Sequence, residues 1–134
     1  MFGALDISTS ALVAQRQRMT AISANMALRP VTVDPNSNPD DFRRRIVVFG
    51  TGDPSTGRSE GVHLERVEYE QTPFRKKWEP GHPFADQDGY VKYPNIDSSI
   101  EMVNALETSR AYEANITAAE ATKSMAQANL RLLA

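Results

Sequence analysis

The residues that could do chemistry are few and widely spaced in this chain of 134 residues. His63 and His82 are the only histidines, and there is no cysteine. A zinc site needs three or four ligands, so carboxylates would have to supply the rest. The segment Asp86-Gln87-Asp88-Gly89 has part of a calcium-loop pattern but lacks the later glutamate. We therefore expect a turn at residues 86–89 and predict neither a metal nor a cofactor.

Catalytic patterns are missing as well. Asp40 and Asp41 are adjacent carboxylates, but they lie in a segment of proline and asparagine that is expected to be a loop. The chain has no nucleophile elbow, phosphate-binding loop or dinucleotide glycine pattern. We predict that the protein is not an enzyme.

Two basic clusters, Arg43-Arg44-Arg45 and Arg75-Lys76-Lys77-Trp78, carry the remaining chemistry. Clustered cations beside an aromatic ring can hold phosphates and stack a base. The net charge of −2 gives no overall attraction toward nucleic acid, so we expect ion pairing at the surface or with neighbouring subunits. A cytoplasmic helical adaptor or nucleic-acid-binding module remains the alternative, and salt-dependent binding would favour it.

The elements that position these residues begin with a helix over residues 7–27, which contain no glycine or proline. Asp6 or Ser8 is expected to cap it, and Pro30 to end it. The insert that follows has three β-prone runs, at residues 45–49, 62–69 and 90–93. Glycine and proline predict loops at residues 30–41, 50–61 and 73–89.

The last element is a predicted helix over residues 98–132, with Ser98 and Glu101 forming a capping box. It would be roughly 50 Å long, and its apolar seam advances in steps of three and four residues, as in a left-handed coiled coil. An ordinary intrachain core is the alternative for this seam, but the seam is longer than a monomer of this size could bury, so we expect part of it to contact other subunits. The predicted assembly interface comprises Leu12, Met19, Ile22, Met102, Ala105, Ser109, Tyr112, Ile116, Ala119, Lys123, Ala126 and Leu130.

These elements predict an α+β fold in which long N- and C-terminal helices pair as an antiparallel coiled coil around a small β-rich insert. We expect residues 1–30 to form the first helix of that module, residues 31–96 the insert and residues 97–134 the second helix. No apolar run approaches the ~20 residues that span a bilayer. The first residues lack the pattern of a cleaved secretory signal, and from composition alone the chain would be assigned to the cytoplasm.

Several segments resemble one known family in order and spacing. They are Glu79-Pro80-Gly81-His82-Pro83, Gly89-Tyr90-Val91-Lys92-Tyr93-Pro94-Asn95-Ile96-Asp97, Ser109-Arg110-Ala111-Tyr112-Glu113-Ala114-Asn115 and Thr122-Lys123-Ser124-Met125. The resemblance is to the rod and hook proteins of the bacterial flagellum, and among them to proximal-rod subunits of the basal body. In place of that family's Asn/Ala-rich exit from the first helix, this chain has Met26-Ala27-Leu28-Arg29-Pro30.

The resemblance implies a structural subunit that polymerises with copies of itself and with other rod subunits into a rod crossing the periplasm and transmitting motor torque. It also implies export through the flagellar type III apparatus without a cleaved signal peptide, no nucleic-acid partner and no insertion into the membrane. The implied location, the basal body, replaces the cytoplasmic assignment.

Overall fold

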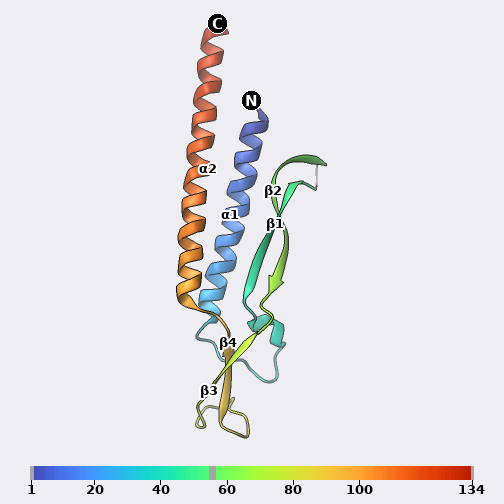
Figure 1. The fold of residues 1–134 in the computed structure, drawn as a ribbon, viewed down its shortest axis with the longest axis vertical. Coiled ribbons are helices and arrows are strands. Elements are labelled where there is room, and N and C mark those ends of the chain that lie inside the picture. The colour runs from blue at the N-terminus through green and yellow to red at the C-terminus, as the bar shows by residue number, and fades with distance from the viewer. Residues whose placement is uncertain (1, 55–56, 134) are drawn as a thin grey trace.

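Two antiparallel helices run side by side along most of the molecule in the computed structural model, which describes residues 2–54 and 57–133 (Figure 1). They are α1 (Phe2–Leu28) and α2 (Ser98–Leu133), and both chain termini lie at the same end. The predicted antiparallel orientation and the extent of the second helix are confirmed. The β-rich insert between the helices is also present, so the fold class is α+β.

Helix α1 starts earlier than predicted. Asp6 and Ser8 lie inside it, and the Ser8 hydroxyl donates a hydrogen bond to the carbonyl oxygen of Ala4 at 3.1 Å, so the predicted cap at either residue is wrong. At the other end, Arg29 N–H still bonds to the Asn25 carbonyl at 3.1 Å. The helix therefore stops just before Pro30, which has no N–H to continue the ladder.

The predicted capping box of α2 is also wrong. Asp97 is the cap, since its carboxylate accepts a hydrogen bond from the backbone N–H of Ser99 at 2.8 Å. The side chain of Glu101 turns inward instead and bonds to Asn25 and Arg44. These partners, distant in sequence, remove Glu101 from the local role that its spacing from Ser98 suggested.

A hairpin of β1 (Arg45–Asp53) and β2 (Arg58–Tyr69) lies along α1, so that α1 is sandwiched between the hairpin and α2 (Figure 1). The predicted loop over residues 50–61 is wrong, because both strands extend far into it. Pairing against α1 explains the difference: Val62 N–H donates to the Ser10 hydroxyl at 3.1 Å. Gly61, with φ of 93°, permits this close approach.

A second hairpin, β3 (Phe74–Trp78) with β4 (Tyr90–Pro94), lies at the end opposite the termini (Figure 1). The sequence predicted β4 but placed β3 in a loop, because prolines and glycines flank the short run of residues 74–78. Residues 86–89 form the expected turn: the carboxylate of Asp86 accepts hydrogen bonds from the N–H groups of Asp88 and Tyr90.

The buried core is small for a chain of this length. Among the described residues, the buried apolar side chains are Ala14, Ile22, Val33, Val91, Pro94 and Ile96. Four polar residues are buried as well, namely Ser8, Asn25, Glu101 and Thr108. Because few large apolar groups are removed from water, the hydrophobic contribution to the stability of an isolated monomer is modest.

Candidate assembly interface

Asn25, Arg44 and Glu101, here called the polar node, join the two helices to the first hairpin. Glu101 is 0% exposed. One of its carboxylate oxygens accepts a hydrogen bond from Arg44 Nε at 2.7 Å, and the other accepts one from Asn25 Nδ2 at 3.1 Å. A buried carboxylate is tolerated only when it is paired and hydrogen-bonded, and both conditions are met here.

The amide of Asn25 also takes the place of a neighbouring strand at the start of β1. Its Oδ1 accepts from the N–H of Arg45 and its Nδ2 donates to the Arg45 carbonyl, both at 2.9 Å. The guanidinium of Arg44 lies 3.5 Å from the carboxylate of Glu70, just after β2. The node thus holds the end of α1, the start of α2 and the base of the first hairpin in one arrangement.

The first basic cluster is used within the chain. Arg43 donates to the Glu70 carbonyl at 2.7 Å, pairs with Asp40 at 3.0 Å and lies over the ring of Tyr69. Arg44 belongs to the polar node. These contacts engage the guanidinium groups of Arg43 and Arg44 within the chain, so neither group is free to bind a phosphate backbone.

The predicted interface residues differ in how far they are exposed. Ile22 is buried and Leu12 and Met19 are half-buried on α1. On α2, the half-buried members are Ala105, Ser109, Ile116, Ala119 and Ala126. The exposed members are Met102, Tyr112, Lys123 and Leu130.

The stripe of α2 that faces α1 is displaced by one residue from the seam that the sequence predicted. Glu101 and Thr108 are buried where the sequence favoured Met102 and Ser109, and one residue corresponds to about 100° around the helix. The sequence did not predict these positions as buried, because Glu and Thr are mostly exposed in folded proteins. Thr108 satisfies its hydroxyl inside the helix by donating to the Asn104 carbonyl at 2.7 Å, which allows its burial.

A mostly apolar groove of about 200 Å³ lies between the helices, where the two predicted seams meet. Met19 on α1 and Ser109 and Tyr112 on α2 are among its lining residues. Gln15 also lines it, and the Gln15 Oε1 atom is buried without a hydrogen-bond donor among the described residues. The groove has the shape and polarity to receive side chains from a further helix.

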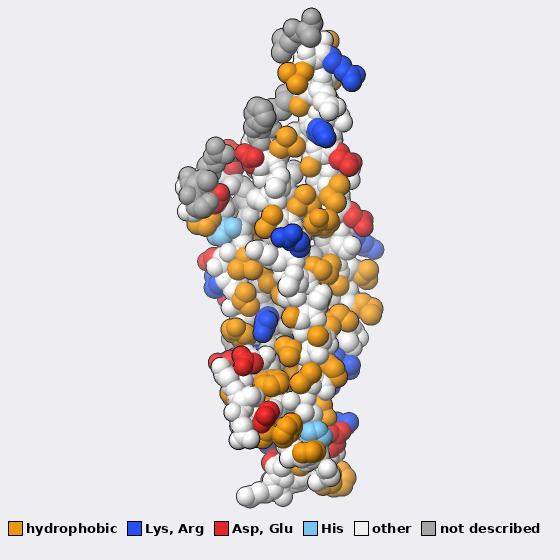
Figure 2. All heavy atoms as spheres, turned by 180° about the vertical axis from the view of Figure 1, so that it is seen from behind, with side chains coloured by type: hydrophobic (Ala, Val, Ile, Leu, Met, Phe, Trp, Pro, Cys, Tyr) orange, Lys and Arg blue, Asp and Glu red, His pale blue; other side chains and the backbone are white. Residues whose placement is uncertain are grey.

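Large apolar side chains also cover parts of α2 that α1 does not reach. Met102, Val103 and Leu106 are exposed near its start, with Val103 at 61%. The pairs Asn25–Glu101 and Arg18–Glu107 set a register in which the start of α1 is level with about residue 124 of α2. Met125, Leu130 and Leu132 lie on the overhang beyond that point. Figure 2 shows hydrophobic side chains along nearly the whole length of one face.

The two histidines lie in separate elements. His63 on β2 places Nδ1 2.7 Å from the Gly52 carbonyl oxygen, and His82 packs against the ring of Phe84 in the loop before β4. Within residues 2–54 and 57–133, no three metal-binding side chains of His, Cys, Asp or Glu come together. In the same part of the chain, no helix has the length and apolarity to span a membrane.

Comparison with known proteins identifies relatives for almost the whole chain. The family model for the C-terminal region of flagellar basal body rod FlgEFG proteins matches residues 87–132, which cover β4 and most of α2. The flagellar basal-body rod protein FlgC of Escherichia coli O6:H1 is 39% identical over 127 residues, which are 95% of this chain and 93% of that protein. FlgC of Bacillus subtilis is 33% identical, with 92% of each chain covered. FlgC of Borreliella burgdorferi is 31% identical, with 99% of this chain and 97% of that protein covered.

Proposed function

Because this chain belongs to the FlgC family of flagellar basal-body rod proteins, we propose that neighbouring rod subunits complete the apolar surface of its two helices. The protein is a structural subunit of the basal-body rod and not an enzyme. The proposal assigns residues 1–30 and 97–134 to a coiled-coil module. It assigns residues 31–96 to an insert that contacts neighbouring subunits from outside.

The observation that carries the proposal is the exposed apolar surface of α2. Met102, Val103 and Leu106 are exposed on its early turns, and Leu132 is 84% exposed on the overhang. A helix with apolar residues on several faces is typical of a larger core than one chain provides. Further helices packed against these faces would remove them from water.

The groove between α1 and α2 is the proposed seat of one such helix. Met19 and Tyr112 supply apolar walls, and Ser109 is small enough for a close crossing. A donor from the incoming helix would also satisfy the buried oxygen of Gln15. In this arrangement the predicted seam residues make contacts between subunits.

We further propose that the copies stack in the proximal rod through head-to-tail contacts, together with other rod subunits. Contacts between different surfaces need not close into a ring, and they can then generate an open helical assembly. Long helices packed along the rod axis would resist bending and twisting, so that motor torque passes through many side-chain contacts. Neither nucleic acid nor an inserted membrane segment has a role in this proposal.

Export through the flagellar type III apparatus, with the N-terminal segment retained, is part of the same proposal. The support from the fold is the central position of α1. Its residues Ser10 and Asn25 bond to β2 and β1, and Arg18 lies 3.6 Å from Glu107 of α2. Cleavage within α1 would remove the element against which both other layers pack.

The experiment compares Ile116→Asp and Leu130→Asp with Asn129→Asp in flagellated cells that lack their own copy of the subunit. All three variants add one negative charge to α2, but only the first two place it on the predicted seam. We expect both seam variants to be exported and to fail in rod assembly, while Asn129→Asp supports swimming. Export is measured by immunoblot, assembly by electron microscopy of basal bodies and swimming in soft agar.

Normal rods with either seam variant would contradict the proposal. So would a loss of assembly in all three variants, because the effect would then follow from charge and not from position on the seam.

A further inference from the structure

The β3–β4 hairpin has two faces with different charge arrangements. Side chains alternate between the faces of a strand, and the antiparallel register aligns Lys76 with Lys92 and Trp78 with Tyr90. These four residues therefore share one face, here called the lysine face. Arg75, Lys77 and Tyr93 share the other.

On that other face the cations have partners. Lys77 Nζ lies 2.6 Å from a carboxylate oxygen of Glu79, and the hydroxyl of Tyr93 donates to Glu79 at 2.8 Å. These two hydrogen bonds, from Lys77 and from Tyr93, lower the pKa of Glu79. The guanidinium of Arg75 lies 5.9 Å from the centre of the Tyr93 ring.

The lysine face carries positive charge that no acidic side chain of the described residues neutralises. Three of the four lysines of the chain are on this hairpin, and Lys76 is directly opposite Lys92. Neither ammonium group pairs with any residue that the structure describes. Like charges directly opposite each other destabilise a strand pair, so this face favours a bound anion. Beside them, Trp78, the only tryptophan, is 64% exposed.

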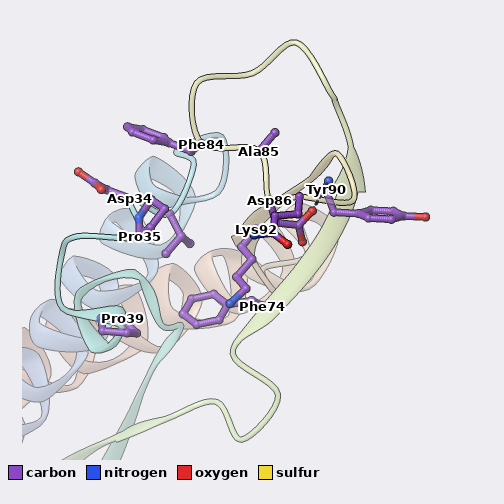
Figure 3. Close-up of a pocket in the computed structure, with 11 residues that line it drawn as sticks. Asp34, Pro35, Pro39, Phe74, Phe84, Ala85, Asp86, Tyr90 and Lys92 are labelled. Carbon is purple, nitrogen blue, oxygen red and sulfur yellow. Dashed lines mark hydrogen bonds between the residues drawn. The ribbon is translucent and has the colours of Figure 1, made fainter.

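An apolar hollow of about 460 Å³ adjoins the lysine face. Phe74, Phe84 and Pro39 contribute to its walls, and the side chain of Lys92 extends along it toward Phe74 (Figure 3). The carboxylates of the two acids that line the hollow accept hydrogen bonds from backbone N–H groups of their own turns. Asp34 accepts from Asn36 N–H at 2.8 Å, and Asp86 accepts from Tyr90 N–H at 2.8 Å.

We propose that the lysine face and this hollow dock an acidic peptide segment, bearing an apolar side chain, from a neighbouring basal-body protein. Carboxylates of the segment bind between Lys76 and Lys92, the apolar side chain enters the hollow, and Trp78 lies beside the contact. This contact is separate from helix packing, because the hairpin lies at the end of the molecule away from the α2 overhang (Figure 1).

The experiment uses the fluorescence of Trp78, which reports on this face alone because the chain has no other tryptophan. The purified full chain is titrated at low ionic strength with the peptides Glu-Glu-Leu-Glu-Glu and Glu-Glu-Ser-Glu-Glu. We expect a saturable change that is lost in 0.5 M salt, with tighter binding of the leucine peptide. The double variant K76Q/K92Q should bind roughly tenfold more weakly. The control K123Q removes a lysine from exposed α2 and should bind normally.

Phe84→Ser tests the hollow separately, and it should abolish the preference for leucine over serine. The proposal is overturned if neither peptide changes the fluorescence, or if K76Q/K92Q binds as well as the unmodified chain. Tighter binding of an oligonucleotide or of anionic vesicles would also overturn it. So would a monomer–dimer equilibrium that K76Q/K92Q abolishes without peptide, because the occupant would then be a second copy. Failure here leaves the Ile116 and Leu130 test of rod assembly unaffected.

Discussion

Glu101 has no surface exposed to water in the folded chain. Hydrogen bonds from Asn25 and Arg44 replace those that its carboxylate makes to water in the unfolded chain. A buried ion pair contributes little net stability, because desolvation offsets most of the attraction. Its value here is specificity: Asn25, Arg44 and Glu101 satisfy one another in a single alignment of α1, β1 and α2. A helix shifted by one turn would leave these groups unpaired.

We expect Glu101→Ala to destabilise the monomer by about 3–5 kcal/mol, because the partly buried Arg44 loses its closer carboxylate and keeps only Glu70 at 3.5 Å. The matched control is Glu107→Ala on the same helix. Glu107 is 69% exposed and lies 3.6 Å from Arg18, so its loss should cost less than ~1 kcal/mol. Urea unfolding at low protein concentration measures both, and equal effects would refute the role of the node.

The Lys77–Glu79–Tyr93 cluster predicts an acid-sensitive contact in the second hairpin. The native pKa of Glu79 is lowered by hydrogen bonds from Lys77 and Tyr93, so the unfolded chain binds more protons near the ordinary glutamate value of about 4.3. The stabilisation from this contact is therefore complete above that pH and is lost as the pH falls further. NMR titration should show the pKa of Glu79 rising in Lys77→Met and unchanged in Lys123→Met.

At the scale of elements, α1 is the layer on which the other two depend. The approach of β2 to α1 is close enough that a Cβ on Gly61 would lie 2.8 Å from the Ser10 hydroxyl oxygen. The positive φ of Gly61 adds a second reason for glycine at this position. The first hairpin can therefore lie flat on α1 only because Gly61 has no side chain.

Gly61→Ala should destabilise the protein by more than Gly57→Ala, the matched control. Both glycines have positive φ, and that conformation costs alanine about 1–2 kcal/mol. Only Gly61 has a neighbour in the way, since a Cβ on Gly57 meets nothing within 4 Å. Thermal unfolding of both variants tests this, and Ser10→Ala should partly rescue Gly61→Ala. Equal losses of stability would show that packing against α1 is not the cause.

The two parts of α2 differ in whether another helix packs against them. Up to about residue 124 the helix lies beside α1, and beyond it the helix has no partner within the described chain. We expect amides beyond Ser124 to exchange fastest in the free monomer and to become protected in assembled rods. Hydrogen exchange with mass spectrometry measures this. Uniform protection of α2 in dilute monomer would contradict the view that assembly orders its end.

At the scale of the whole molecule, the helical end and the hairpin end offer different surfaces. The helical end carries an apolar overhang with Leu130 and Leu132, and the other end carries the lysine face beside a hollow. An elongated molecule with unlike ends suits an assembly that grows in one direction. This arrangement agrees with the membership of the chain in a rod-protein family.

Truncation after Ser124 tests whether the overhang of α2 is needed for assembly and not for folding of the monomer. The overhang buries little surface in the monomer, so its removal should change monomer stability by less than ~0.5 kcal/mol. Rod assembly should be lost, because the apolar end that neighbours cover is gone. Calorimetry of the purified variant and microscopy of basal bodies provide the two measurements. Assembly of normal rods from the truncated chain would show that the overhang is not part of the interface.

Local patterns were sufficient for the elements with strong periodicity or clear boundaries. Helix α2, the end of α1 near Pro30 and strands β1, β2 and β4 were predicted from such patterns. Strand β3 was missed because Pro73, Pro80 and Gly81 around it predicted a loop, and only pairing with β4 makes residues 74–78 a strand. The start of α1 was misplaced and the cap of α2 was misassigned, because a serine or an aspartate near a helix start satisfies the cap pattern equally well inside the helix.

The sequence by itself determined that two long helices flank a small insert, and it predicted that the apolar seam of the second helix exceeds what one chain can bury. Those conclusions depend on periodicity and composition, which are local. Only the tertiary structure decided which stripe of α2 faces α1, because Glu101 finds its partners 57 and 76 residues away. A carboxylate has the same polarity in a cap and in a buried pair, and the distant groups around it decide between the two.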